Sequence, residues 1–467
     1  MWLGVTHARV FDEGDGMHFE KESLGLLPEG LGLLEEGFTS LPPAASPVAG
    51  RERMAEVMQQ VAARLRDNYP YFHPLYAGQM LRPPHPLARA AYALATWINP
   101  NNHALDGGRA SSAMEKEAVA ELAAMFGWQA HLGHLASGGT MTNLEALWVA
   151  GQLHPGKKIV ASAEAHYTHH RISGVLKLPF AEVPSDARGR LDTQALAAML
   201  AAGDIGCVVA TAGTTAAGSV DPLPEILRLR EQYGFRLHVD AAYGGYFKLA
   251  RNLAAETRAA YEVIGQADSI VVDPHKHGLQ PYGCGCVLFR DPSVGALYKH
   301  ESPYTYFTSS ELHLGEISLE CSRPGAAAVA LWATQRLLPL VRGGEFAAGL
   351  EACREAAVDL AARLSADSRW LVPFAPDLDI VLWAPRANSA AETSELSQRI
   401  FDAAAKRGLH LALVHLPLRY FPSLCTGRPD EPRTVLGLRS VLMKPEHREW
   451  IGRIWETLDR AWRDAAQ

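Results

Sequence analysis

The pattern of hydrophobic and polar positions divides the chain into three stretches. Residues 1–105 carry helical periodicity broken by prolines, as over 51–67, and predict a helical extension packed on something larger. Between 106 and 340, short β-rich runs alternate with amphipathic helices, which predicts a large domain. Residues 341–467 combine Ala-rich helix, strands such as 379–383 and 409–414, and a final helix from His447. They predict a smaller C-terminal α/β domain.

The β-rich runs of the central stretch define the predicted sheet. They are 158–162, 205–211, 236–240, 269–272 and 285–289. Strands that alternate with helices form a mainly parallel sheet covered on both faces, so the fold class is α/β. Ligands of such sheets bind beyond the carboxyl ends of the strands. Reactive side chains directly after these runs are therefore candidates for a ligand site.

Composition narrows the class of protein. Hydrophobic residues make up 48% of the 467 residues, charged residues 20%, and the net charge is -7 without a long run of Lys or Arg. These values predict a globular protein with a small-molecule substrate and no nucleic-acid partner. No apolar run is long enough for a membrane span, and the first residues lack the apolar core of a secretory signal. Six scattered cysteines suit a reduced cytoplasm, with Cys284 and Cys286 as small apolar residues on one strand face.

A glycine-containing turn leads into the helical run 141–150. Its residues are Ser137, Gly138, Gly139 and Thr140. Glycines at a helix N-terminus let backbone N–H groups approach an anion, and the helix dipole adds to the attraction, so this turn is a candidate phosphate site. An ordinary capped helix start gives the same pattern. We call residues 137–140 the glycine turn.

Two further strand ends carry an acid and an amine. Asp240 ends the run 236–240, and a carboxylate there can keep a heterocyclic nitrogen protonated, while Ala242 leaves room for a flat ring. Lys276 follows the run 269–272 after His275, and a lysine in such a pocket can attack an aldehyde. A loop-capping Asp and a surface Lys are the alternatives.

The remaining strand ends carry an imidazole and hydroxyls. His166 follows the run 158–162 and could stack on an aromatic cofactor and handle protons. Thr214 follows the run 205–211 and suits a phenolic oxygen. His169 and His170 invite a metal interpretation, but no acidic or cysteine ligand completes a known spacing, so no metal is predicted. The glycine turn, His166, Thr214, Asp240 and Lys276 would suit five parts of one molecule. These parts are the phosphate, the ring face, the ring hydroxyl, the ring nitrogen and the aldehyde of pyridoxal 5′-phosphate.

The same residues carry a family resemblance. The segments His238-Val239-Asp240-Ala241-Ala242-Tyr243-Gly244-Gly245 and Asp273-Pro274-His275-Lys276 resemble the group II pyridoxal-phosphate-dependent amino acid decarboxylases, which include aromatic-L-amino-acid, tyrosine and glutamate decarboxylases. The resemblance runs from about residue 73 to 323, and more thinly to about 445. It implies the fold of aspartate aminotransferase, fold type I, with a sheet of seven-stranded type.

The resemblance also implies a role for each site residue. Lys276 would be the Schiff-base lysine, Asp240 the partner of the pyridine nitrogen, and His166 and Ala242 the residues on the two ring faces. Ser137, Gly138, Gly139, Thr140 and His275 would contact the phosphate, Thr214 the ring hydroxyl, and Arg439 the substrate carboxylate. Tyr304 or Tyr306 would supply the proton-donating tyrosine of a mobile loop that looks shorter here. His277 stands where the family often has Trp, so local packing and substrate preference stay open.

The predicted activity is decarboxylation of an L-amino acid to its primary amine and CO2, by a homodimer with the active site at the interface. An aldehyde synthase, an aminotransferase, another carbon–carbon lyase and a non-catalytic protein on the same fold are the alternatives. An aromatic substrate is favoured slightly over an acidic one. Aromatic residues near the presumed entrance either line a pocket for an aromatic side chain or equally well pack together; they are Tyr69, Tyr71, Phe72, Tyr76, Tyr304, Tyr306 and Phe307. A pocket lined by Arg82, Lys299 or Arg323 would instead suit an acidic side chain.

Overall fold

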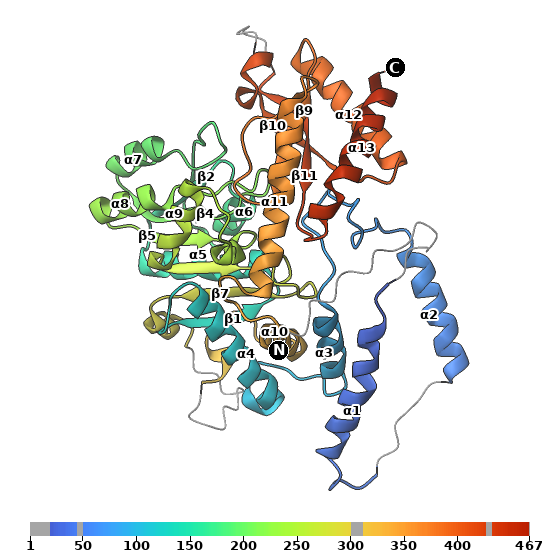
Figure 1. Cartoon of the computed structure of the whole chain (residues 1–467). Coiled ribbons are helices and arrows are strands. Elements are labelled where there is room, and N and C mark those ends of the chain that lie inside the picture. Colours follow the sequence, from blue (N-terminus) through green and yellow to red (C-terminus); the bar gives the residue numbers. More distant parts are fainter. Residues whose placement is uncertain (1–18, 44–49, 300–311, 426–431, 467) are drawn as a thin grey trace. The chain divides into compact units, whose positions relative to one another are not determined.

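The computed structural model describes residues 19–43, 50–299, 312–425 and 432–466 (Figure 1). Tyr304 and Tyr306 therefore lie outside the described residues. The chain forms two compact units, Met1–Ala45 and Ser46–Gln467. The described part of the first unit holds a 3-10 turn, η1 (Glu22–Gly25), and one helix, α1 (Leu26–Glu36).

The second unit contains a seven-stranded sheet. Its strands are β1 (Leu132–Ala136), β2 (Lys158–Ser162), β3 (Phe180–Val183), β4 (Ile205–Thr211), β5 (Arg236–Asp240), β6 (Ser269–Val272) and β7 (Gly285–Phe289). They lie in the order β1-β7-β6-β5-β4-β2-β3, and β7 runs antiparallel to both of its neighbours while the other pairs are parallel. The predicted mainly parallel sheet is confirmed, and all five predicted runs are strands with the predicted bounds.

Helices cover both faces of this sheet because its central strands are apolar on both sides. On β4, Cys207 and Val209 pack against α5 (Gly139–Leu153) and α6 (Thr168–Val175). Val208 and Ala210 face the opposite way, toward a core shared with α4 (Leu105–Met125), α7 (Thr193–Ala201), α8 (Leu223–Tyr233) and α9 (Ala255–Val263). Burial on both faces is what the continuous β-branched runs predict. Cys284 and Cys286 are buried in the second core.

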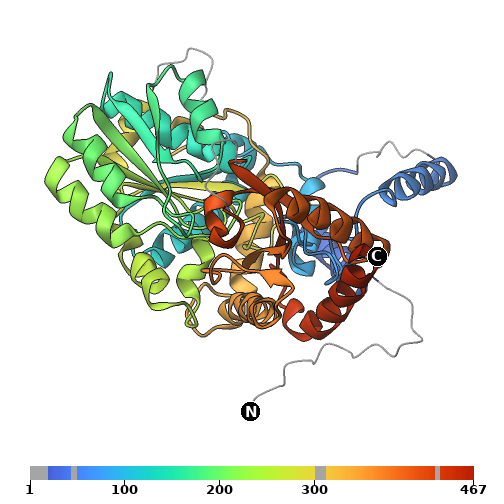
Figure 2. The same ribbon diagram turned by 90° about the horizontal axis from the view of Figure 1, so that it is seen from above.

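A second, antiparallel sheet follows toward the C-terminus. Its strands lie in the order β10-β11-β9-β8 and are β8 (Trp370–Leu371), β9 (Ile380–Pro385), β10 (Ala412–Pro417) and β11 (Thr434–Val441). It packs on α11 (Glu345–Ala366), α12 (Ala390–Lys406) and α13 (His447–Ala466), the orange to red helices of Figure 2. The strand expected over 409–414 begins three residues later, at Ala412.

Three more helices complete the second unit. They are α2 (Arg51–Leu65), α3 (Pro86–Thr96) and α10 (Gly325–Leu337), and α3 packs on α10. Short 3-10 turns are η2 (Gly245–Leu249), η3 (Ile264–Gln266), η4 (Pro292–Leu297), η5 (Leu314–Glu316), η6 (Leu418–Tyr420) and η7 (Pro422–Leu424). Across the described ranges, no helix combines the length and apolar character needed to cross a membrane.

Candidate active site

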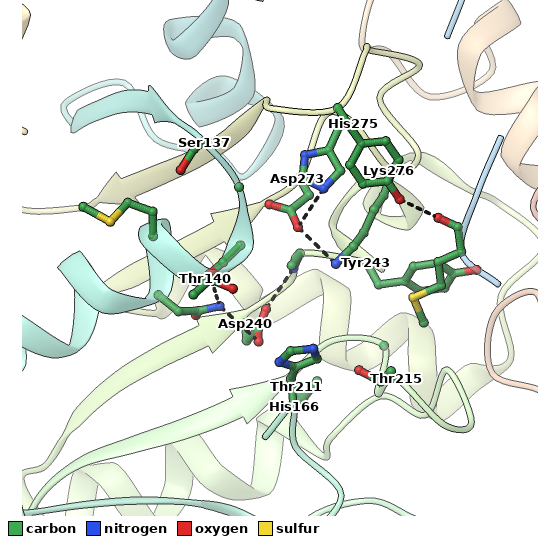
Figure 3. Close-up of a pocket in the computed structure, with 18 residues that line it drawn as sticks. Ser137, Thr140, His166, Thr211, Thr215, Asp240, Tyr243, Asp273, His275 and Lys276 are labelled. Atoms are coloured by element: carbon green, nitrogen blue, oxygen red, sulfur yellow. Dashed lines mark hydrogen bonds and ion pairs between the residues drawn. The ribbon is translucent and has the colours of Figure 1, made fainter. Parts of the chain in front are cut away.

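The carboxyl ends of the central strands meet around one cavity. In register, Thr211 at the end of β4 pairs with Asp240 at the end of β5, and Asp240 pairs with Val271 of β6. Lys276 follows four residues after β6 ends at Val272. The cavity measures about 320 Å³ and is drawn in Figure 3. Its lining residues are Met80, Ser137, Gly138, Gly139, Thr140, Met141, Asn143, His166, Thr211, Gly213, Thr215, Asp240, Ala242, Tyr243, Asp273, His275, Lys276 and Tyr282.

The glycine turn forms one wall of the cavity. It follows β1, and α5 begins at Gly139. Gly138 has φ +149°, a conformation that L side chains rarely adopt, and a Cβ there would approach the His275 ring to 3.1 Å. A Cβ on Gly139 would lie 2.7 Å from Asp273 Oδ2. Both positions thus require glycine, and the helix N-terminus behind them faces the cavity.

One contact of the glycine turn was not foreseen. The backbone N–H of Ser137 donates to Glu320 Oε2 at 3.0 Å. That N–H already has a carboxylate acceptor, so an incoming phosphate would compete with Glu320 for it.

Lys276 is paired with an acid from its own turn. Its Nζ lies 3.0 Å from Oδ2 of Asp273, a carboxylate that is almost fully buried. His275 Nε2 lies 3.6 Å from the same oxygen, and its Nδ1 lies 2.8 Å from the Cys284 carbonyl oxygen. Because the carbonyl accepts, Nδ1 of His275 carries a hydrogen. Burial lowers the pKa of His275, so at neutral pH the ring is uncharged.

Asp240 is held by donors on both carboxylate oxygens. Oδ1 accepts the Ala242 N–H at 3.1 Å, and Oδ2 lies 2.9 Å from His169 Nε2 and 3.3 Å from Asn143 Nδ2. Burial alone would raise the pKa of Asp240, but the hydrogen bond from His169 and the positive charge of Lys276 bring it below its ordinary value. The carboxylate is therefore ionised over the physiological range.

His166 presents a defined tautomer to the cavity. Its Nδ1 accepts the backbone N–H of Thr168 at 3.2 Å, and the Thr168 hydroxyl contacts the same nitrogen. Burial lowers the pKa of His166, although the Asp240 carboxylate acts in the opposite direction. The neutral ring with an accepting Nδ1 has its hydrogen on Nε2.

The structure brings most of the predicted site residues together. Ser137, Gly138, Gly139, Thr140, His166, Asp240, Ala242, His275 and Lys276 all line the cavity.

Two of the predicted residues that the structure describes, Thr214 and Arg439, are not among the lining residues. Thr214 is fully buried, and its Oγ1 accepts the Ser219 N–H at 3.1 Å, while Thr211 and Thr215 face the cavity instead. Arg439 donates to the Thr215 carbonyl at 2.7 Å and to Gln79 Oε1 at 2.7 Å. Arg439 thus lies directly behind a lining residue.

Sequence reasoning missed four side chains that shape the site. Asp273 directly follows β6 and lines the cavity. Its position after a strand could have suggested this. Asn143, in the second turn of α5, and His169, in the first turn of α6, lie beside Asp240, and no sequence pattern marks them as partners of that carboxylate. Tyr282 stacks on His275 with ring centroids 4.5 Å apart.

His277 lies away from the cavity. It is 1% exposed, and its ring packs edge-on against Tyr243 and Phe247 at 4.7 and 5.0 Å. The presence of His instead of Trp at this position therefore affects packing in the core and not the lining of the cavity.

The residues fit pyridoxal 5′-phosphate. An amine (Lys276) and an ionised carboxylate (Asp240) line the same cavity. The N-terminus of α5, where Gly138 and Gly139 have no side chains, also lines it. Oδ1 of Asp273 is buried with no hydrogen-bond partner among the described residues, so the wall has polar capacity left for a ligand. This donor set matches an aldehyde, a ring nitrogen and a phosphate.

Comparison with known proteins gives the same result. The family model described as the pyridoxal-dependent decarboxylase conserved domain matches residues 53–384. L-tyrosine decarboxylase of Enterococcus faecium is 28% identical over 469 residues, covering 77% of each chain. A probable L-tyrosine/L-aspartate decarboxylase of Methanospirillum hungatei is 32% identical over 278 residues, 59% of this chain and 72% of the relative.

A solved structure shows the same fold. The crystal structure of Oryza sativa TDC with PLP and tryptamine superposes with a TM-score of 0.76 at 17% identity, covering 97% of this chain and 99% of that one. The family match includes the whole seven-stranded sheet, the glycine turn and the segment Asp273–Lys276. The chain therefore belongs to the family of pyridoxal-dependent decarboxylases.

Proposed function

We propose that the protein converts an aromatic L-amino acid to its primary amine and CO2, using pyridoxal 5′-phosphate held by Lys276. The observation that carries this proposal is the convergence of Lys276, Asp240 and His166 on one cavity from three different strand ends. When bound, the cofactor supplies an electron sink for the bond that breaks at the substrate α-carbon. Everything else is supplied by side chains of this chain.

Each of the three residues has a role that follows from its surroundings. Asp240, ionised and held by three donors, would keep the ring nitrogen protonated. Lys276 would hold the aldehyde through Nζ, and Asp273 Oδ2, 3.0 Å from Nζ, would accept a proton from it. His166 offers Nε2–H to the cavity and would lie on one face of the ring.

The other sequence-derived roles form part of the same proposal. Ala242 would leave space on the opposite ring face, and Ser137, Gly138, Gly139, Thr140 and His275 would hold the phosphate. Thr211 or Thr215 would replace Thr214 as the hydroxyl nearest the ring, because both line the cavity and Thr214 does not.

The lining favours an aromatic over an acidic side chain. Met80 and Tyr282 form an apolar wall, joined by a 3.1 Å hydrogen bond from the Tyr282 hydroxyl to the Met80 carbonyl. Among the described residues that line the cavity there is no arginine. Arg323 is bound to Glu115 at 2.6 Å in the interior, so it cannot serve an acidic substrate.

Three of the aromatic residues near the presumed entrance pack against one another. Tyr69, Tyr71 and Tyr76 pack against one another with ring centroids 5.0–6.3 Å apart, and Tyr69 packs on His410. They do not line the cavity in the described part of this chain. The aromatic preference therefore rests on Met80 and Tyr282.

Arg439 is the proposed holder of the substrate carboxylate. It is 6% exposed, and its Nε is buried with no hydrogen-bond partner among the described residues. Its Nη groups contact the carbonyl of Thr215, a lining residue, and Gln79 Oε1. Arg439→Lys should raise KM more than it lowers kcat, because the flat paired donors are lost while the charge remains. Equal KM values for the two forms would remove Arg439 from this role.

Lys276→Ala tests the central claim. Wild-type protein with pyridoxal 5′-phosphate should show a visible absorbance band and covalent cofactor after borohydride reduction, and Lys276→Ala should show neither. Lys157→Ala, an exposed lysine, is the matched control. A band that persists in Lys276→Ala without added amine would contradict the proposal.

A product assay separates the rival reactions. Tyrosine, tryptophan, phenylalanine, aspartate and glutamate should each be supplied with measurement of CO2, ammonia and hydrogen peroxide. Of the three measured products, decarboxylation to the amine releases only CO2, whereas an aldehyde synthase also releases ammonia and hydrogen peroxide. Turnover confined to the two acidic substrates would refute the aromatic preference.

A tyrosine near the active site is proposed to protonate the product carbon. The candidates stay Tyr304 and Tyr306, which lie outside the described residues. Replacing the true donor by Phe should slow amine formation, and any CO2 released in excess of amine should be matched by aldehyde, ammonia and hydrogen peroxide, with dioxygen as the oxidant. The other Phe variant serves as its control. Unchanged amine yield in both variants would exclude a tyrosine donor at these positions.

We also propose a homodimer with the active site at its interface. Helix α2 has no buried residue, and its apolar side chains follow helical spacing at Met54, Val57, Met58, Val61 and Leu65, all at least 42% exposed. A second copy of the chain would cover this stripe. Light scattering should give twice the chain mass of 50.7 kDa, and Val57→Glu with Val61→Glu should dissociate it. A monomeric active enzyme would refute the dimer.

A cytoplasmic location is proposed from the cysteines. All six are free, and Cys207, Cys284, Cys286 and Cys353 are buried. Free buried thiols suit a reducing compartment. Recovery of the active protein in the culture medium or in a periplasmic extract would contradict this location.

A further inference from the structure

A histidine outside the sequence-derived site contacts the Asp240 carboxylate. His169, near the start of α6, places Nε2 2.9 Å from Asp240 Oδ2. The side chains of His169 and Asp240 are 1% and 6% exposed. His169 does not line the cavity, and its side chain is linked to the cavity by the hydrogen bond to Asp240.

The chemistry of this contact fixes the direction of the hydrogen bond. An ionised carboxylate can only accept, so Nε2 of His169 must carry the hydrogen in either protonation state of the ring. Nδ1 of His169 is buried and has no hydrogen-bond partner among the described residues. The ring is therefore placed for its contact with Asp240 and for no other polar contact that the structure describes.

The second side-chain donor to Asp240 has other commitments. Asn143 Nδ2 lies 3.3 Å from Asp240 Oδ2 but 2.8 Å from the Gly139 carbonyl. Its Oδ1 accepts from His238 Nε2 at 2.8 Å. The shorter and less shared donor is His169, and charge-assisted hydrogen bonds of this kind are the stronger ones.

The other ionisable groups near His169 are Asp240, His238 and His166. The rings of His169 and His238 lie 6.5 Å apart, and burial keeps His238 neutral by lowering its pKa to about 3. Lys276 contributes positive charge from across the cavity. Asp240 is the sole anion in this group, and its nearest donor is His169.

We propose that His169 is a positioning residue that, through Nε2–H, orients Asp240 and keeps it ionised toward the ring nitrogen of the cofactor. This inference rests on the proposed function, because it requires Asp240 to face the pyridine ring. It is supported by the lowered pKa of Asp240: burial opposes that shift, and the hydrogen bond from His169 produces the largest part of it.

Four variants test the role of His169. His169→Phe keeps a ring and removes the donor, His169→Asn shortens the side chain so that its amide cannot reach Asp240, and His169→Gln places an amide N–H near the original Nε2. His170→Phe is the matched control, since the adjacent His170 is exposed and packs on Phe180 at 5.4 Å. Thermal melting of each cofactor-free protein reports whether it folds.

The measurements are the dissociation constant of pyridoxal 5′-phosphate and the pH midpoint of the visible band of the loaded protein. His169→Phe and His169→Asn should weaken binding about 10- to 100-fold, as loss of a supporting hydrogen bond does at other cofactor and metal sites. Their acidic midpoint should rise, because Asp240 becomes easier to protonate. His169→Gln should stay within about threefold of wild type, and His170→Phe should match wild type.

A double-mutant cycle identifies the route. If His169 acts through Asp240, replacing it in an Asp240→Asn background should change the dissociation constant far less than in the wild-type background. Equal effects in both backgrounds, or a His169→Phe or His169→Asn protein with wild-type affinity and midpoint, would overturn the proposal. Should His169→Phe fail to fold, the comparison of His169→Asn with His169→Gln decides alone. Absence of a covalent complex in the wild type would instead refute the proposed function.

Discussion

Glu115 anchors the strand from which the glycine turn leaves. On α4, it is 1% exposed, and its Oε1 accepts the Leu135 N–H at 2.9 Å and Arg323 Nη1 at 2.6 Å. Oε2 accepts from Asn102 Nδ2 at 2.6 Å. Leu135 lies two residues before Ser137, so one carboxylate ties α4, β1 and the segment before α10 to the wall of the cavity. We predict that Glu115→Gln destabilises the whole second unit.

The size of the effect follows from burial. Glu115→Gln removes the charge that balances Arg323, and breaking a buried pair from one side costs about 3–5 kcal/mol. The entropy of unfolding is about 2.1 cal/mol/K per residue, which for 467 residues amounts to about 1 kcal/mol/K. The melting temperature should therefore fall by about 3–5 °C.

The control lies on the same helix. Glu117 and its partner Arg336 are 55% and 48% exposed at 3.3 Å. Exposed pairs contribute about 0.2–1 kcal/mol, so Glu117→Gln should lower the melting temperature by about 1 °C or less. Scanning calorimetry of the cofactor-free proteins measures both changes. Shifts of equal size in the two variants would refute the claim that the buried pair holds β1 in place.

Three further outcomes follow from individual contacts. Gly139→Ala should weaken pyridoxal 5′-phosphate binding at least about tenfold, since its Cβ would lie 2.7 Å from Asp273 Oδ2; equilibrium dialysis measures this, and unchanged affinity would contradict it. Because burial lowers the pKa of His238 to about 3, the unfolded chain binds one more proton between pH 3 and 6.5, so stability should fall on acidification by about 1.4 kcal/mol per pH unit from this residue. Urea unfolding from pH 4 to 7 should show a smaller slope in His238→Gln. Tyr282→Ala should raise KM for an aromatic substrate about three- to tenfold through the lost contact with His275, and a larger fall in kcat than rise in KM would argue against it.

Strand positions could be predicted from the sequence because they depend on local pattern. The five predicted runs of the large sheet match observed strands, and the acid, amine and imidazole at their ends share one cavity. The sequence also placed β7 in the sheet, but its direction depends on tertiary pairing: β6 precedes β7 along the chain, whereas β1, its other neighbour in the sheet, is the first strand of that sheet. The small sheet was located less well, since β10 begins three residues after the predicted start.

Hydrogen-bond partners could not be predicted because they depend on tertiary distance. Thr214 follows a strand end, where a cofactor-binding hydroxyl is expected, yet it is fully buried beside Ser219 and does not line the cavity. Thr211, at the strand end itself, faces the cavity. His169 invited a metal interpretation from its neighbour in sequence, and the structure gives it a carboxylate partner 71 residues away.

The two carboxylates of the cavity show how one site can hold opposite electrostatic demands. Asp240 is surrounded by N–H donors, and under the proposed function its fixed negative charge would hold a proton on the ring nitrogen. Asp273 contacts the amine of Lys276 and lies against the glycine turn, where a phosphate would meet a second anion. A phosphate at that place must therefore draw its binding from the helix N-terminus and from backbone N–H groups directed at it. Lys276 and His275 both lie beside Oδ2 of Asp273. Their contacts offset the negative charge of this carboxylate, which reduces its repulsion of a phosphate.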